Sequence, residues 1–439
     1  MRQNISIATI LALTLPTPLL ARDVLTIATV GNPDMERLQR LSPAFTDAHP
    51  NVQLNWVALD ENTLRQRVTT DIATGAGRFD IVTIGSYEAP IWAERRWLLP
   101  LDEMPAGYDE ADLLPSIRAS LSHEDTLFAA PFYAESSFTM YRTDLFEAAG
   151  LTMPDAPDWS FIREAAATIS AENEGVHGIC LRGKPGWGEN VALITAMANA
   201  YGARWFDADW QPQLDSPAWS SAVSDYVSLL QEFGPPDPQA NGYTENLALF
   251  QQGDCAIWVD ATVAASAVTD PELSQVADQV GFAMAPGAGQ DKTSNWLWSW
   301  ALGISAQSPH QEVAKTFVAW ATSAEYAALV AREEGWSQVP PGTRASLYEN
   351  ASYLNAAPFA EMALASLNAA DPANPTVEAV PYTGIQFVGI PEFPGIGTAV
   401  GSQIAEALAG EITVEEALEN AQWVTAQVIA RARFIDDTE

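Results

Sequence analysis

The N-terminal part of the chain alternates β-branched runs with amphipathic stretches, and this alternation limits the fold more than any other feature. Residues 24–30, 52–58 and 79–84 are short and rich in Val, Ile and Thr, which is typical of strands. Between them, residues 35–48 and 63–74 place apolar side chains at helical spacing. The order strand, helix, strand, helix, strand predicts a mostly parallel sheet with helices on both faces.

The same kinds of segment return later in the chain, so the pattern predicts two α/β lobes followed by a largely helical C-terminal part. A stretch rich in Pro and Gly, 381–397, interrupts that helical part. We expect further strands at 137–141, 177–182, 255–259, 280–284 and 297–304. We expect further helices at 159–171, 189–201, 216–232, 244–251, 309–321, 323–332, 356–369, 397–409 and 414–431.

Length and charge narrow the class of protein. The 439 residues suit two or three domains, and 48% hydrophobic residues are enough for large cores. The 56 acidic and 21 basic residues leave a net charge of −35. Binding to nucleic acid or to an anionic membrane surface needs clustered Lys and Arg, so this charge argues against both.

The N-terminus has the pattern of an export signal. An apolar run at 5–15 follows Arg2, is too short to span a bilayer, and is followed by a small residue, Ala21. We therefore expect residues 1–21 to be a signal peptide, with a soluble protein exported to the periplasm. No Cys follows Ala21 directly, so we expect no lipid anchor. A buried first strand or helix is the alternative reading of the same run.

The two cysteines, Cys180 and Cys255, both lie in short apolar runs that we expect to be buried strands. They could form a disulfide in an oxidising compartment if those strands are neighbours. Two free thiols in the core are equally compatible with the sequence.

Motifs for catalysis and for cofactors are incomplete. None of the four His has another His at metal-ligand spacing, and Gln307 replaces the closing Gly of a nucleophile elbow. Pro185 follows Gly183-Lys184, so there is no phosphate-binding P-loop. We expect no cofactor, no metal and no enzymatic activity, although a pair of carboxylates for glycoside hydrolysis stays open.

Aromatic and polar residues gather where the predicted strands end. Tyr87 follows one strand, Arg182 ends another and Lys184 follows it, and Asp260 follows a third. Ligands of open α/β sheets bind beyond the carboxyl ends of the strands. Flat rings suit the C–H faces of a polyhydroxylated ligand, and charged or amide groups suit its hydroxyls.

Each of these residues also has a structural interpretation. Tyr87 could belong to the core, and Asp260 could be the N-cap of a helix at 261–264. Trp296, Trp298 and Trp300 alternate and so share one face of a strand, where we expect at least one to serve packing alone.

Seven stretches together resemble the family 1 extracellular solute-binding proteins of bacterial ABC importers, and in particular their sorbitol- and mannitol-binding branch. These stretches are 79–92, 131–151, 177–190, 255–266, 297–305, 335–344 and 381–398. The resemblance implies a two-lobed periplasmic-binding-protein-like fold of type II, with a hinge of crossing segments. It places lobe one at 22–135 plus 285–323, and lobe two at 136–284 plus 324–439.

The resemblance also implies a binding site and partners. The protein would capture a sugar alcohol between the lobes and, as a monomer, deliver it to ABC permease subunits in the inner membrane. The alternatives are a mono- or oligosaccharide-binding protein, a binding protein that serves a sensor, and a secreted enzyme acting on glycosides. The ligand-binding residues would be Asn32, Ser86, Tyr87, Tyr133, Glu135, Arg182, Lys184, Trp187, Asp260, Trp298, Trp336 and Gln386.

Overall fold

The computed structural model describes residues 22–436, so the predicted signal peptide at 1–21 lies outside the described residues. The described part contains a five-stranded sheet, a three-stranded sheet and a short two-stranded hairpin. The strands are β1 Asp23–Val30, β2 Val52–Leu59, β3 Ile81–Gly85, β4 Ser122–His123, β5 Thr126–Leu127, β6 Ala129–Glu135, β7 Ser137–Arg142, β8 Ile257–Ala261, β9 Val280–Met284 and β10 Trp298–Ile304.

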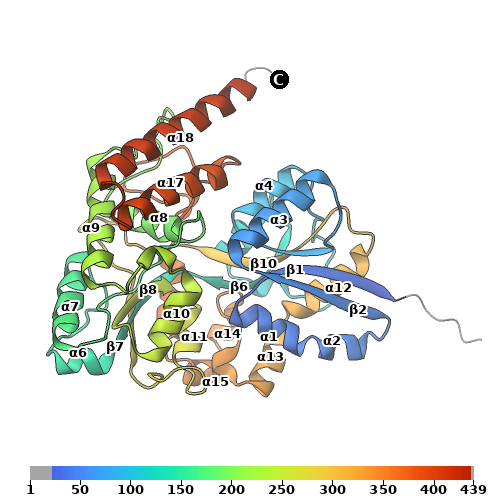
Figure 1. Cartoon of the computed structure of the whole chain (residues 1–439). Helices are drawn as coiled ribbons and strands as arrows, with labels where there is room; N and C mark the ends of the chain where they lie inside the picture. Colours follow the sequence, from blue (N-terminus) through green and yellow to red (C-terminus); the bar gives the residue numbers. More distant parts are fainter. Residues whose placement is uncertain (1–21, 437–439) are drawn as a thin grey trace, which may run out of the picture.

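The first sheet has the strand order β2-β1-β3-β10-β6 and forms the centre of what we call the first lobe. Strands β1, β2 and β3 are parallel, as predicted, whereas β10 runs antiparallel to both of its neighbours. Helices α3 (Glu61–Thr74) and α4 (Glu88–Glu94) cover one face, and α1 (Pro33–Leu41) and α2 (Pro43–Ala48) cover the other (Figure 1).

The helix predicted at 35–48 is two helices, because Pro43 has no N–H to continue the hydrogen-bond ladder. Asn32 begins the first of them, since its side-chain oxygen accepts a hydrogen bond from the Met35 N–H at 3.0 Å.

The second sheet has the order β8-β7-β9, with antiparallel pairs, and forms the centre of the second lobe. The strand predicted at 177–182 is wrong in part: this segment runs beside β8 but pairs with it only through isolated bridges. The reason is that the Ile179 N–H turns away to the carbonyl of Phe233, which interrupts the ladder between His177 and Cys180.

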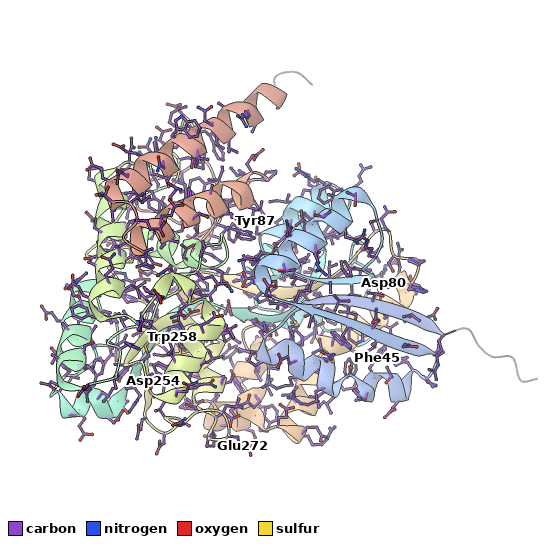
Figure 2. The ribbon with its side chains drawn as sticks, in the orientation of Figure 1. Phe45, Asp80, Tyr87, Asp254, Trp258 and Glu272 are labelled. Atoms are coloured by element: carbon purple, nitrogen blue, oxygen red, sulfur yellow. A yellow bond between two sulfur atoms is a disulfide. The ribbon has the colours of Figure 1, made fainter. Side chains whose placement is uncertain are left out.

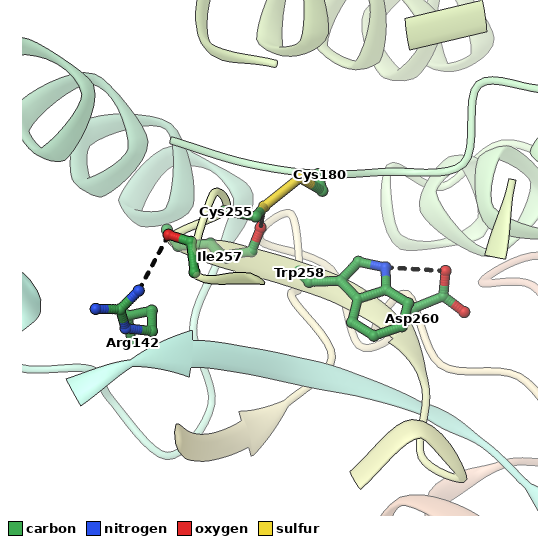
Figure 3. The surroundings of a disulfide bond; sticks show 7 residues. Arg142, Cys180, Cys255, Ile257, Trp258 and Asp260 are labelled. Carbon is green, nitrogen blue, oxygen red and sulfur yellow. Dashed lines mark hydrogen bonds between the residues drawn. A yellow bond between two sulfur atoms is a disulfide. The ribbon is translucent and has the colours of Figure 1, made fainter. Parts of the chain in front are cut away.

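Cys180 and Cys255 form a disulfide between this segment and the residues that lead into β8 (Figure 3). Their Cα atoms are 6.2 Å apart, within the range that a disulfide requires. The bond joins parts of the second lobe that lie 75 residues apart in the chain.

The lobes are linked by segments that cross side by side. Strand β6 of the first sheet ends at Glu135, and β7 of the second sheet begins at Ser137. The chain returns from the second sheet to the first between β9 and β10. The Ser137 hydroxyl donates to the Ser294 carbonyl at 2.7 Å, which ties the outgoing segment to the returning one. The lobe boundaries given by the sequence stay a prediction.

Helices form most of the remaining chain, and the C-terminal pair α17 and α18 packs on the second lobe (Figure 1). Within residues 22–436, none of the helices combines the length and the apolar character that crossing a membrane needs. The other α-helices are α5 Pro115–Ser120, α6 Thr143–Ala148, α7 Trp159–Glu172, α8 Asn190–Ala200, α9 Pro217–Phe233, α10 Tyr243–Gln252, α11 Ala264–Val268, α12 Gln311–Ala321, α13 Ala324–Glu333, α14 Ala345–Tyr348, α15 Ala351–Ala356, α16 Ala360–Ala369, α17 Phe393–Leu408 and α18 Val414–Asp436.

Candidate functional site

A cavity of about 880 Å³, counted with the space at its mouth, lies where residues of the two lobes meet. Residues from the ends of β1, β6 and β10 line one side, and residues from the loop before α8 and the start of α10 line the other. The lining residues are Val30, Gly31, Asn32, Asp60, Glu61, Arg65, Tyr133, Glu135, Arg182, Lys184, Trp187, Gly188, Glu189, Ala192, Tyr243, Thr244, Val263, Trp296, Trp298, Trp300 and Gln386.

The first lobe contributes an aromatic wall whose position depends on one glycine. Trp300 pairs with Gly85 across β10 and β3, and the Trp298 indole lies directly over Gly85. A Cβ atom at position 85 would come within 1.9 Å of the Trp298 ring, so only glycine lets the indole lie there. Trp296, Trp298 and Trp300 all line the cavity, and the expectation that at least one of them serves packing alone stays a prediction.

The second lobe contributes a buried ion pair at the bottom of the cavity. The Arg182 guanidinium donates to both oxygens of Asp260, with distances of 2.7 to 3.1 Å. Asp260 also accepts from the Trp258 indole at 3.2 Å (Figure 3) and from the Ala261 N–H at 2.6 Å. Asp260 lies inside β8, so its predicted alternative role as a helix N-cap is wrong.

Glu135 brings an unusual carboxyl group into the cavity wall. It ends β6, is 6% exposed, and its carboxyl group takes part in none of the side-chain hydrogen bonds found among the described residues. Burial raises its pKa to about 8, with smaller contributions from Asp260, Glu61 and Asp34, and Arg182 opposes the increase. Near neutral pH this carboxyl can therefore donate a hydrogen bond as well as accept one.

Two buried polar atoms in the wall have no hydrogen-bond partner among the described residues. They are the indole nitrogen of Trp298, which can only donate, and the Oε1 atom of Gln386, which can only accept. The amide nitrogen of Gln386 is held by the Leu297 carbonyl at 2.9 Å, which fixes the direction of Oε1. A hydroxyl group can satisfy either atom, because it both donates and accepts.

The loop after β2 and the first turns of α3 also contribute to the cavity, which the sequence did not predict. Glu61 and Arg65 line the cavity, and Arg65 donates to Glu61 at 2.9 Å and to Glu88 at 2.6 Å. This contribution could have been predicted from the parallel strands. Because β2 is parallel to β1, the carboxyl ends of both strands lie at the same edge of the sheet, where ligands bind. Tyr243 and Glu189 were also not predicted; Glu189 is buried and Tyr243 partly buried, and both lie beside Arg182.

Most of the predicted site residues lie together in the cavity wall, and we treat their contact with a ligand as a proposal. Asn32 and Tyr133 face each other there, with the Asn32 amide donating to the Tyr133 hydroxyl at 2.8 Å. The predicted residues that line the cavity are Asn32, Tyr133, Glu135, Arg182, Lys184, Trp187, Trp298 and Gln386.

Ser86 and Tyr87 are not among the lining residues. Tyr87 lies on the side of the first lobe that faces α17 (Figure 2), and its hydroxyl donates to the Ile390 carbonyl at 2.8 Å. Its ring packs against Trp187, with the ring centroids 4.9 Å apart. Tyr87 thus contacts the second lobe rather than the cavity, because its strand end is covered by the Trp298 indole.

Trp336 is also absent from this cavity. It lines a second cavity together with Phe132, Tyr326 and Arg344, near the segment that follows α12. Asp260 does not line the cavity either. It is fully buried, and its link to the cavity is its ion pair with Arg182.

The chain belongs to the family of bacterial extracellular solute-binding proteins, whose model matches residues 31–328. It is 54% identical to a mannitol-binding protein of Pseudomonas aeruginosa over 429 residues, which are 97% of this chain and 98% of the relative. The family and the extent of this match confirm the resemblance seen in the sequence.

Solved structures confirm the two-lobed fold. An ABC transporter solute-binding protein of Agrobacterium vitis with bound D-mannitol is 58% identical, with a TM-score of 0.92, covering 93% of this chain and 99% of that chain. A protein of the same kind from Agrobacterium radiobacter in complex with ribitol is 25% identical, with a TM-score of 0.82 and the same coverage.

Proposed function

We propose that this protein is the solute-binding component of an ABC importer for sugar alcohols, with a hexitol such as D-mannitol as its ligand. The observation that carries the proposal is the cavity between the lobes, where four tryptophans line the wall and two polar atoms, Nε1 of Trp298 and Oε1 of Gln386, have no hydrogen-bond partner among the described residues. A sugar alcohol has C–H faces, which aromatic rings can cover. It also has a hydroxyl group on every carbon, and these hydroxyls can bond to the isolated donor and acceptor.

The charges of the cavity support a neutral ligand. Arg65 is paired with Glu61 and Glu88, and Arg182 is paired with Asp260, so neither guanidinium needs a negative charge from the ligand. The wall also carries the carboxyl groups of Asp60, Glu135 and Glu189. Glu135 adds little negative charge near neutral pH because its pKa is about 8, whereas the pKa of Asp60 is lowered and its carboxylate lies near Lys184, the remaining cation of the wall. The negative charge of a sugar acid or a sugar phosphate would be repelled by the Asp60 carboxylate, which disfavours such ligands.

The relatives support the same ligand class. The Pseudomonas aeruginosa relative is a mannitol-binding protein, and the Agrobacterium vitis structure contains D-mannitol. The ribitol complex at 25% identity extends this support to a shorter sugar alcohol. For this chain we propose export to the periplasm, action as a monomer, delivery of the ligand to membrane permease subunits, and no enzymatic turnover.

A thermal-shift screen of hexitols, pentitols, monosaccharides and disaccharides tests the ligand class. Bound ligand adds RT ln(1 + [L]/Kd) to the free energy of unfolding, about 2.7 kcal/mol at a hundredfold excess over Kd. We expect the largest rise in melting temperature with a hexitol, and the hexitol should be recovered unchanged after incubation. A larger rise with a disaccharide, or release of a product from a glycoside, would contradict the proposal.

A further inference from the structure

A contact between the lobes lies in the cavity wall, where Arg65 of α3 meets Trp187 of the second lobe. The Arg65 guanidinium carbon is 3.9 Å from the centroid of the Trp187 ring. The Arg65 side chain is only 9% exposed. A guanidinium group within about 6 Å of an indole face is attracted by the ring, and more strongly where water is excluded.

Carboxylates of the first lobe hold the Arg65 guanidinium in place. Glu61 accepts from Nε and Nη2 of Arg65 at 3.1 and 2.9 Å, and Glu88 accepts from Nη1 at 2.6 Å. Glu88 is itself fixed by the Gly85 N–H at 2.9 Å. Burial lowers the pKa of Arg65, but Glu88 and Glu61 outweigh it and raise the pKa, so the group stays charged. Its orientation is therefore set before any contact with the second lobe.

Aromatic rings of the first lobe complete a socket for Trp187. The ring centroids of Tyr87 and Trp298 lie 4.9 and 6.0 Å from that of Trp187. Trp298 and Trp300 are also within 5 Å of the Arg65 guanidinium carbon, at 4.8 and 4.9 Å. We call Arg65, Tyr87 and Trp298 the Trp187 socket. Only its occupant, Trp187, comes from the second lobe.

The neighbouring backbone confirms that the lobes touch here. A Cβ atom at Gly188 would lie 2.1 Å from Glu61 Oε1 and 3.2 Å from Arg65 Nη2. Position 188 therefore has no room for a side chain while Glu61 holds Arg65. The segment that carries Trp187 is anchored to the second lobe, because Arg182 at its start binds Asp260 of β8.

Charged groups of both lobes surround Arg65. Glu61 and Glu88 face it from the first lobe, and Glu189, Lys184 and Arg182 lie across from it in the second. Burial and then the facing Glu61 raise the pKa of Glu189 to about 7, against Arg182 and Lys184. The carboxylates that pair with Arg65 both belong to the first lobe, so its orientation does not depend on the charges of the second lobe.

We propose that Arg65 is a clasp residue, which holds the lobes closed by binding Trp187 and so slows the release of the ligand. This inference rests on the proposed function, since it assigns a role in the same site. The socket is filled only when the lobes meet, so the clasp stabilises the closed form whichever polyol is bound. Arg65 therefore sets how long a polyol stays bound and leaves the preference among polyols unchanged.

Stopped-flow tryptophan fluorescence with D-mannitol and ribitol tests the clasp in wild type and in Arg65→Lys. Lysine keeps the charge but loses the planar face and the fork of donors. We expect dissociation to be about 2- to 30-fold faster for both polyols, from the range measured for cation–π contacts. The ratio of the two affinities should stay within twofold. Arg67→Lys, exposed on the same helix, is the matched control and should release both polyols at the wild-type rate.

A second variant separates the clasp from a direct contact with the ligand. In a Trp187→Leu background, Arg65→Lys should change the dissociation rate by less than twofold, because the partner of the guanidinium is already gone. A wild-type dissociation rate in Arg65→Lys, or an undiminished effect in the Trp187→Leu background, would overturn the inference. So would a tenfold change in the ratio of mannitol to ribitol affinity. Failure of the wild type to bind any polyol would overturn the proposed function instead, and the clasp with it.

Discussion

Asp260 acts on the cavity through another residue. Its carboxylate is fully buried and is occupied by Arg182, the Trp258 indole and a backbone N–H. Arg182 in turn donates to the Gly188 carbonyl at 3.0 Å, next to the residue that enters the Trp187 socket. Asp260 thus fixes the guanidinium that the ligand would meet, and it has no oxygen in the cavity wall.

We predict that Asp260→Ala destabilises the protein as well as weakening binding. Removing one partner of a buried ion pair leaves an uncompensated charge and costs about 3–5 kcal/mol. Urea denaturation followed by circular dichroism measures this loss. Asp144→Ala is the control, because Asp144 also pairs with an arginine but is 37% exposed, and such pairs contribute about 1 kcal/mol or less. Equal losses in the two variants would contradict the role of Asp260.

Glu135 should make the stability of the ligand-free protein depend on pH. Its pKa is about 8 in the folded protein and 4.5 for the ordinary group, so the folded state binds more protons between these values. The free energy of unfolding should therefore fall as the pH rises through this window and level off above it. Glu189, with a pKa of about 7, acts in the same direction.

Glu135→Gln, which keeps the shape and cannot ionise, should reduce this fall. Melting temperatures measured from pH 5 to pH 9 in the wild type and the variant give the comparison. Glu36→Gln, at an exposed position, should keep the wild-type slope. If Glu135→Gln kept the full wild-type slope, Glu135 would not be the group responsible.

Among the elements, the strand ends were predictable and the loops between them less so. The parallel part of the first sheet follows from three β-branched runs. Ligands of open α/β sheets bind beyond the carboxyl ends of the strands, so the same runs also indicate which edge of the sheet carries the site. Asn32 and Glu135 were predicted from the resemblance to the family, and Glu135 ends β6, a strand that the sequence pattern did not predict. The position of Tyr87 outside the cavity could not be predicted, because it depends on the Trp298 indole of a strand more than 200 residues later, lying over Gly85.

The errors at 177–182 and at Trp336 have a similar origin. An apolar run predicts burial, but the hydrogen bond of Ile179 to Phe233 depends on a distant segment of the second lobe. Trp336 lies in a short helical turn packed near the crossing after α12, and local sequence does not show which side of the crossing segments faces the ligand.

The disulfide links two elements of the second lobe, and we predict a measurable contribution to stability. The chain-entropy relation gives about 4 kcal/mol for closing a loop of 75 residues. Urea denaturation with and without reductant should show a lower midpoint in the reduced protein. The Cys180→Ala, Cys255→Ala double variant should have the urea midpoint of the reduced wild type, and reductant should not change that midpoint. Two reactive thiols in the unfolded, unreduced wild type would contradict the bond.

At the scale of the whole molecule, the ligand site and the contact between the lobes are one structure. Trp187 and Arg65 line the cavity and also join the lobes. Each lobe carries part of the wall, so a ligand gains all of its contacts only in the closed form. That difference in contacts is the free energy by which binding can shift the equilibrium towards closure.

Titration calorimetry of the purified mature protein with D-mannitol tests the central claim most directly. We predict saturable binding of one D-mannitol per chain, and no comparable binding of a charged sugar acid of the same length. Absence of binding with D-mannitol, sorbitol and ribitol alike, under conditions where the protein is folded, would contradict the account.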